Sequence, residues 1–192
     1  ETAETIDKLE DGTFIVTTNK GTKHHAKAVA IAGGLGTVEP RKPQLENIAF
    51  YEEKGVEYFV KNPELFRDKR IVIAGGGDSA LDWSIFLSNV AASVTLIHRR
   101  NEFRGALDSV EKVQELKSAG KIKLITPAEV VGFKGTERIE SIDVEINGAR
   151  MNVPTDYFIP LFGLTPKLGA IANWGLEIEK NAIKVNNALD YQ

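Results

Sequence analysis

The sequence predicts an α/β fold, because short apolar runs that suit buried strands alternate with segments of helical periodicity. In the middle of the chain, strand-like runs at residues 71–74 and 93–97 enclose an apolar, helix-like segment at residues 80–87. Between residues 128 and 162 the apolar period falls to two, which is typical of an antiparallel meander. We therefore expect a Rossmann-like, three-layer nucleotide-binding domain with an antiparallel β-meander.

The central strand at residues 71–74 runs directly into the glycines Gly75, Gly76 and Gly77. The pattern Gly75-x-Gly77-x-x-Ala80 fits the dinucleotide fingerprint: a tight turn, a close approach of backbone to pyrophosphate, and a small third residue where helix and strand pack. The amides and the dipole at the helix start favour phosphate groups. The alternative is an ordinary strand-to-helix turn, but the complete strand, turn, helix and second strand favour a nucleotide site.

The end of the second strand indicates which nucleotide is bound. A domain for NAD usually places an acid about 20 residues after the glycines, where it accepts from the ribose 2′-hydroxyl. This chain has His98, Arg99 and Arg100 there, with Arg104 close behind. Guanidinium groups stay charged and donate in a fork that matches a 2′-phosphate, so the sequence predicts NADP(H). Two alternatives stay open: Glu102 as a displaced ribose acceptor, and a merely solvated arginine surface.

Composition excludes several classes of protein. The 192 residues are 42% apolar and 27% charged, as in an ordinary soluble protein. The net charge of −3 argues against a nucleic-acid partner, which needs a concentrated positive field. No apolar run approaches the ~20 residues that span a bilayer, so we expect no membrane partner. The absence of cysteine excludes disulfides, thiolate metal sites and dithiol redox chemistry.

Near the start of the chain, an alternating pattern at residues 6–18, with turn residues at 10–12 and 19–21, predicts a hairpin. His24 and His25 follow it. Neighbouring residues of a strand point to opposite faces, and no other histidine lies nearby in the sequence. We therefore expect no metal site there.

A second glycine cluster, residues 33–36, follows the apolar run at residues 28–32. It is not a second fingerprint, because Pro40 and Pro43 oppose a regular helix after it. We interpret it as a close crossing of the backbone or a hinge.

Before the central strand, residues 41–55 are typical of a connection, and residues 63–66 predict a short helical segment. After the arginines, apolar residues recur at helical spacing, and Gly120 is placed to end that helix. We expect this stripe in the core; its members are Leu107, Val110, Val113 and Leu116. The remaining strands are expected at residues 122–125, 130–133, 142–146, 151–153 and 157–162, with short ones at 176–179 and 183–185.

The chain divides into three stretches. Residues 46–165 form the nucleotide-binding domain, while residues 1–45 and 166–192 read as parts of one body that it interrupts, as a domain insertion predicts. The chain opens at Glu1 and stops at Gln192 directly after a strand-like run. We therefore expect a piece of a longer protein.

Four motifs together resemble one known family. They are Gly75-Gly76-Gly77-Asp78-Ser79-Ala80-Leu81-Asp82, His98-Arg99-Arg100-x-x-Phe103-Arg104, the Asn147-Gly148 turn of the meander, and Gly163-Leu164-Thr165-Pro166. They resemble the pyridine-nucleotide domain of the thioredoxin-reductase-like flavoproteins, and most closely the ferredoxin or flavodoxin NADP reductases on that scaffold. The resemblance covers essentially the whole chain and implies NADP(H) here and FAD in the intact protein.

The resemblance also implies a set of cofactor-binding residues. Residues of the glycine turn line the pyrophosphate, and the arginines hold the 2′-phosphate. Asp78 would repel a pyrophosphate that it faced, so we expect it to cap the helix that it begins. The cofactor-binding residues are Gly75, Gly76, Gly77, Asp78, Ser79, Ala80, His98, Arg99, Arg100, Arg104 and Gly163.

Two departures from the family matter. Thioredoxin reductases carry Cys-x-x-Cys where this chain has residues 56–63 without a thiol, which excludes transfer to a disulfide. The glycine fingerprint and the final Gly-Asp motif of the family's FAD domain are also missing. Residues 1–45 and 166–192 therefore represent a partial FAD-type domain, and by resemblance residues 33–41 lie near a flavin in the intact protein.

The implied reaction is hydride transfer between NADPH and FAD, followed by electron transfer to ferredoxin or flavodoxin. It requires no catalytic acid, base or metal from this chain. The resemblance implies a cytoplasmic protein and leaves a homodimer open. A second hypothesis is a module that binds NADP(H) without redox activity, and a third is a structural α/β module with a degenerate site.

Overall fold

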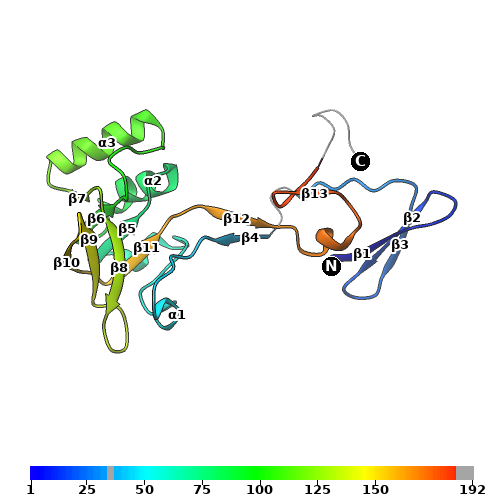
Figure 1. The fold of residues 1–192 in the computed structure, drawn as a ribbon, viewed down its shortest axis with the longest axis horizontal. Coiled ribbons are helices and arrows are strands. Elements are labelled where there is room, and N and C mark those ends of the chain that lie inside the picture. The colour runs from blue at the N-terminus through cyan, green and yellow to red at the C-terminus, as the bar shows by residue number, and fades with distance from the viewer. Residues whose placement is uncertain (34–36, 185–192) are drawn as a thin grey trace. The chain divides into compact units, whose positions relative to one another are not determined.

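The computed structural model describes residues 1–33 and 37–184 and contains two compact units. Unit 1 comprises Glu1–Glu39 and Leu164–Gln192, and unit 2 comprises Pro40–Gly163. Figure 1 labels the elements of both. The domain boundaries expected at residues 45 and 165, and the assignment of the outer parts to an FAD-type domain, stay predictions.

Unit 2 is built on a four-stranded parallel sheet in the order β11-β5-β6-β7. The predicted strands around the glycines and after the arginines are confirmed. The predicted buried strand at residues 157–162 is also confirmed, and it ends at Pro160. The strands are β5 (Arg70–Ala74), β6 (Ser93–Ile97), β7 (Ile122–Ile125) and β11 (Tyr157–Pro160).

Helices cover one face of this sheet and an antiparallel meander covers the other (Figure 1). The helices are α2 (Asp78–Leu87) and α3 (Leu107–Ser118). The meander, in the order β10-β9-β8, consists of β8 (Glu129–Lys134), β9 (Ser141–Ile146) and β10 (Ala149–Pro154). The predicted three-layer α/β fold with a meander is therefore confirmed.

The central strand β5 is apolar on both faces because it supplies both cores. Ile71 and Ile73 are buried in the helix-side core, while Val72 and Ala74 are buried in the meander-side core. Alternate side chains of a strand point to opposite faces, so a strand covered on both sides has no polar face. This burial fixes the end of β5, and with it the position of the glycine turn.

The stripe predicted for α3 is buried in part. Val113 is fully buried, and Val110 and Leu116 pack against the same core. The prediction was wrong for Leu107, which is 69% exposed. Leu107 is the first residue of α3, and the apolar contacts of this helix begin one turn later, at Val110.

The connections of unit 2 contain two short helices. The helical segment expected at residues 63–66 is the 3-10 helix η1 (Pro63–Phe66), where the Asn62 side chain accepts from the Glu64 amide. The helix α1 (Ile48–Tyr51) was expected to be an irregular connection. It follows Asn47 in the left-handed conformation and is too short to show a helical period.

Unit 1 contains the predicted hairpin as part of a three-stranded antiparallel sheet, β1 (Ala3–Lys8), β2 (Phe14–Thr18) and β3 (Lys23–Ala26). On β3, Nε2 of His25 lies 2.7 Å from Oγ1 of Thr13. In residues 1–33 and 37–184, no three histidine, aspartate or glutamate side chains are grouped so that they could hold a metal. Among residues 1–33 and 37–184 of both units, every helix is too short or too polar to span a bilayer.

After the second glycine cluster the chain forms a strand, β4 (Thr37–Pro40), which pairs with β12 (Leu164–Lys167). The prediction that no helix opens there is confirmed, but residues 34–36 of the predicted crossing lie outside the described residues. The end of unit 1 holds a 3-10 helix and the two expected short strands. These elements are η2 (Gly169–Asn173), β13 (Ile178–Glu179) and β14 (Ala182–Ile183), and the predicted strand residue Val185 lies outside the described part.

Candidate nucleotide-binding site

The glycine turn after β5 is packed so tightly that Gly75 and Ala80 must be small. A Cβ built at Gly75 would lie 2.6 Å from the carbonyl oxygen of Leu161 and 2.8 Å from the Cβ of Ala80. Contacts this short force something to move. The predicted tight turn and the predicted close packing of helix against strand are therefore both present.

Gly77 differs from Gly75 because its missing side chain leaves open space. It is the N-cap of α2, with φ −103° and ψ −179°, and no atom lies within 4 Å of a Cβ built there. The amides of Asp78 and Ser79, at the start of α2, have no backbone acceptor within the described ranges. Open space beside unpaired amides at a helix N-terminus fits an anionic group such as a pyrophosphate.

His98 lies against the glycine turn at the end of β6. A Cβ at Gly76 would overlap the His98 imidazole, so only glycine fits over this ring. His98 is 7% exposed. Its ring stacks on Phe103 with 5.2 Å between centroids, and its Nε2 lies 3.2 Å from the Glu102 carbonyl oxygen. The structure thus places His98 as a support between the glycine turn and the loop that follows. A direct contact to a nucleotide stays a prediction.

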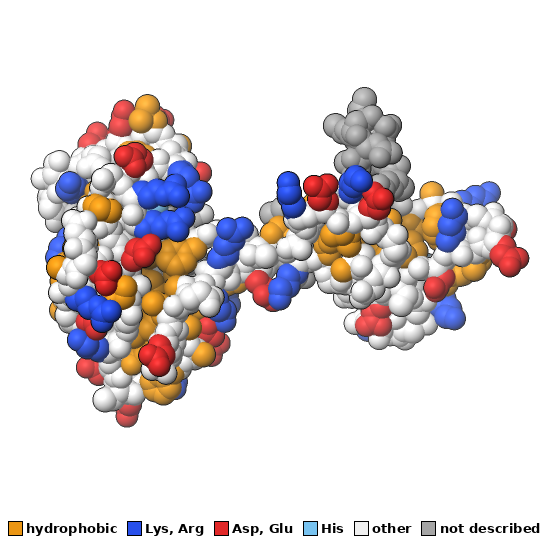
Figure 2. Space-filling view, in the orientation of Figure 1, with side chains coloured by type: hydrophobic (Ala, Val, Ile, Leu, Met, Phe, Trp, Pro, Cys, Tyr) orange, Lys and Arg blue, Asp and Glu red, His pale blue; other side chains and the backbone are white. Residues whose placement is uncertain are grey.

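The three arginines lie on that loop and are exposed. Arg99, Arg100 and Arg104 form no ion pair with any residue in the described part of the chain. All three act electrostatically on His98, so they share one neighbourhood. The amide of Arg104 donates to the Gly76 carbonyl at 2.7 Å, which joins the arginine loop to the glycine turn. Figure 2 shows Lys and Arg side chains gathered on this face of unit 2 near α2.

Burial lowers the pKa of His98 from its ordinary value of 6.5, and the nearby arginines lower it further, against a hydrogen bond to Glu102 that raises it. The folded chain therefore binds this proton more weakly than the unfolded chain does. The associated stability is present above pH 6.5 and is lost as the pH falls through 6.5 toward the lower, folded-state pKa. We expect the free energy of unfolding to fall between pH 7 and pH 5, and to fall less in His98→Gln.

Urea unfolding at several pH values measures how the free energy of unfolding changes with pH. A loss of packing in His98→Gln lowers that free energy equally at every pH, so it does not affect the comparison of the two pH profiles. Carboxylates that titrate near the lower end of this window, including Glu57, whose pKa burial raises, contribute to both profiles and cancel in the comparison. Parallel pH profiles for the wild type and His98→Gln would contradict a buried, neutral imidazole.

The sequence predicted that Asp78 caps α2, and this prediction was wrong. The N-cap of α2 is Gly77, which has no side chain to accept a hydrogen bond. The Asp78 carboxylate reaches the residue before α3 instead, where Oδ1 accepts from the Ala106 amide at 2.7 Å. The correction has a physical reason: Asp78 is already the first helical residue, one position too late to accept from the amides of its own first turn.

Gly163 lies two residues beyond Leu161, whose carbonyl borders the glycine turn. Its φ is +95°, and its carbonyl accepts from the Arg41 amide at 3.0 Å. Within residues 1–33 and 37–184, no hydrogen bond joins Gly163 to the glycine turn or to the arginine loop, so its role in cofactor binding stays a prediction. The other predicted residues, from Gly75 to Ala80 and from His98 to Arg104, come together at the ends of β5 and β6.

Gly105, which follows the arginine loop directly, was not predicted from the sequence as a residue of the site. A Cβ there would lie 2.5 Å from Cδ1 of Leu81, 3.1 Å from Oδ1 of Asp78 and 3.2 Å from the Asp78 nitrogen. The available signal was a glycine placed between Arg104 and the start of the next helix, where no turn requires one.

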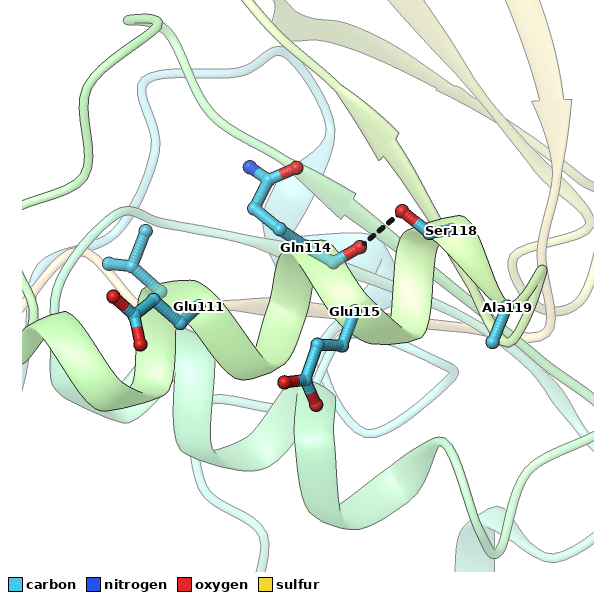
Figure 3. A pocket seen from close by; sticks show the side chains of 6 residues that line it. Glu111, Gln114, Glu115, Ser118 and Ala119 are labelled. Carbon is cyan, nitrogen blue, oxygen red and sulfur yellow. Dashed lines mark hydrogen bonds between the residues drawn. The ribbon is translucent and has the colours of Figure 1, made fainter.

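A surface hollow of about 760 Å³ lies along α3 and carries no residue of this site (Figure 3). Its polar lining includes the carboxylates of Glu111 and Glu115, which would repel the phosphates of a dinucleotide. The glycine turn, and not this hollow, is therefore the candidate site. The lining residues are Val110, Glu111, Gln114, Glu115, Ser118 and Ala119.

Comparison with known proteins agrees with this fold. The family described as pyridine nucleotide-disulphide oxidoreductase matches residues 1–191. Ferredoxin–NADP reductases of Flavobacterium psychrophilum and Flavobacterium johnsoniae are 81% and 79% identical to the chain over 193 and 192 aligned residues. The alignments cover 100% of this chain and 55% of each relative, so the chain spans about half the length of the curated relatives it matches.

Solved structures show the same fold at low sequence identity. Thioredoxin reductase from T. acidophilum has a TM-score of 0.81 and 24% identity, over 96% of this chain and 59% of that one. Thioredoxin reductase from Lactococcus lactis has a TM-score of 0.78 and 24% identity, over 94% and 58%. At this identity the similarity concerns the fold alone.

Proposed function

The chain belongs to the pyridine nucleotide-disulphide oxidoreductase family, and from this premise we propose that unit 2 binds NADP(H) within a ferredoxin or flavodoxin NADP reductase. Residues 75–80 hold the pyrophosphate against the start of α2. Arg99, Arg100 and Arg104 hold the 2′-phosphate. His98 packs against the glycine turn and the arginine loop and supports both segments. The proposal for the whole protein includes FAD, a ferredoxin or flavodoxin partner and a cytoplasmic location, with a homodimer left open.

One observation carries the proposal. Three exposed arginines that form no ion pair within residues 1–33 and 37–184 stand beside a glycine turn that has open space and, in the same ranges, unpaired amides. A cluster of like charges attracts counter-ions, so three arginines beside an anion-binding turn favour a ligand with phosphates at both places. NADP(H) has a pyrophosphate and a separate 2′-phosphate, whereas NAD(H) lacks the second group.

The residues of the chain bind and orient; they move no proton. The chemistry that NADPH would supply when bound at these residues is a hydride, and FAD of the whole protein would accept it. No acid or base of the site is needed for this step. After the second glycine cluster, the described residues form the strand β4 and not a helix. Residues 37–40 therefore provide no helix N-terminus for a flavin phosphate, and we assign no FAD-binding residue.

Titration with NADPH and NADH tests the proposal directly. We expect NADPH to bind more tightly than NADH, by about one to two decades, since charge-assisted contacts to the 2′-phosphate are absent with NADH. NADPH should also raise the melting temperature of the chain. Equal affinities would contradict the assignment of the arginines to the 2′-phosphate. No thermal shift with either nucleotide would favour the structural module with a degenerate site.

The second candidate, an NADP(H)-binding module without redox activity in the chain as given, makes its own prediction. We expect the purified chain to be colourless and to reduce no dye with NADPH, because these residues provide no flavin phosphate loop. Absorbance at the flavin bands and a dye-reduction assay measure this. Yellow protein that turns over would show instead that these residues are sufficient for flavin binding.

A further inference from the structure

Two carboxylates of α2 contact the start of α3, one helical turn apart. Oδ1 of Asp78 accepts from the Ala106 amide at 2.7 Å, and Oδ1 of Asp82 accepts from Oγ of Ser109 at 2.9 Å. Residues at i and i+4 lie on one face of a helix, so both acids point to the same neighbour. The contacts are chemically similar, but only the Asp78 contact lies at the glycine turn.

The chain is fastened to this turn on both sides of Gly105. The Arg104 amide donates to the Gly76 carbonyl at 2.7 Å, and two residues later the Ala106 amide donates to Asp78. Between them, Gly105 lies so close to Asp78 and Leu81 that a Cβ would meet both. Residues 104–106, at the end of the arginine loop, therefore all contact the glycine turn or the start of α2, where the amides proposed to bind a pyrophosphate lie.

We propose that Asp78 is a positioning residue for coenzyme selectivity: its hydrogen bond to Ala106 holds the arginine loop in register with the glycine turn. We call this hydrogen bond the latch. The inference rests on the proposed function. It leaves the Asp78 amide to the pyrophosphate and assigns the Asp78 side chain a task other than touching the nucleotide. With the latch closed, the guanidinium of Arg104 is presented at a fixed place relative to the pyrophosphate amides. Without the latch, that order must be created when the coenzyme binds.

The negative charge of the Asp78 carboxylate would repel a pyrophosphate bound nearby. An ionised carboxylate is a strong acceptor for a backbone amide, and the N-terminus of α2 favours its charge. An asparagine keeps an acceptor oxygen at the same position but removes the charge. The two contributions of Asp78, hydrogen bonding and charge, can therefore be separated.

The test measures the dissociation constants of NADPH and NADH for the 192-residue chain and three variants. In Asp78→Ala we expect the preference for NADPH over NADH to fall about tenfold. The lost charge acts alike on the pyrophosphate that both nucleotides share, and on the 2′-phosphate its loss would favour NADPH, so it cannot cause the expected fall in preference. In Asp78→Asn we expect the preference to stay within about threefold of the wild type.

Asp82→Ala is the matched control, because it removes the same charge and a similar contact one turn further along α2. It should lower the melting temperature without changing the preference. If Asp78→Ala does not fold, Gly105→Ala takes its place, since its methyl group must displace Asp78 or Leu81 and should reduce the preference in the same way.

The outcomes separate this inference from the proposed function. A wild type without preference for NADPH would contradict the proposed function itself. A wild type whose preference depends on Arg99 but is unchanged in a folded Asp78→Ala or Gly105→Ala would contradict the latch alone. An equal loss of preference in Asp78→Asn and Asp78→Ala would also overturn it, because the acceptor would then be irrelevant.

Discussion

Replacing Arg99 with alanine should weaken NADPH binding by about one to two decades and leave NADH binding nearly unchanged. A charge-assisted contact from a guanidinium to a phosphate contributes about 1.5–3 kcal/mol, which corresponds to that loss. Arg99 is exposed, so its removal breaks no ion pair within residues 1–33 and 37–184. Calorimetric titration of both nucleotides gives the two affinities.

Arg150→Ala is the control for a general effect of surface charge. Arg150 is an exposed arginine of β10, and its Nε lies 3.6 Å from Oε2 of Glu145. Its removal should change neither affinity. If Arg99→Ala weakened the affinities for NADPH and NADH equally, Arg99 would not contact the 2′-phosphate. That result would contradict the proposed preference for NADP(H) over NAD(H).

Replacing Gly77 with alanine should weaken NADPH and NADH equally, by about one to two decades, and leave the melting temperature nearly unchanged. No atom lies within 4 Å of a Cβ there, and φ of −103° suits alanine, so the methyl group enters open space. A pyrophosphate that needs the same space meets that methyl group, and overpacking of this kind costs about 1–3 kcal/mol. Both nucleotides carry the pyrophosphate, so their ratio stays constant.

Gly75→Ala provides the contrast within the same turn. Its methyl group would meet the carbonyl of Leu161 and the Cβ of Ala80, so it should lower the melting temperature of the chain itself. Thermal melts of both variants without nucleotide, followed by titration, separate the two effects. Normal binding of both nucleotides by Gly77→Ala would show that no pyrophosphate approaches this backbone.

Much of the fold could be predicted from apolar periodicity because unit 2 is layered. A strand buried on both faces, such as β5, has a continuous apolar run, and the meander strands alternate, so each layer has its own pattern. The pattern failed where a contact depends on tertiary placement. Leu107 continues the helical stripe of α3, yet it lies before the first turn of that helix that contacts the core.

The site was predictable to the extent that its chemistry is local. The glycines from Gly75 to Gly77 and the arginines of the following loop are identified by spacing along the chain. The partner of Asp78 could not be found this way, because Ala106 lies 28 residues away and contributes only a backbone amide. Gly105 was missed for the same reason: the atoms that exclude its side chain belong to α2.

A crystal structure of the chain with NADP⁺ tests the central claim most directly. We expect the 2′-phosphate within hydrogen-bond distance of the guanidinium groups of Arg99, Arg100 or Arg104, and the pyrophosphate over Gly77 at the start of α2. A 2′-phosphate in solvent, with those arginines turned into ion pairs with neighbouring acids, would contradict the account.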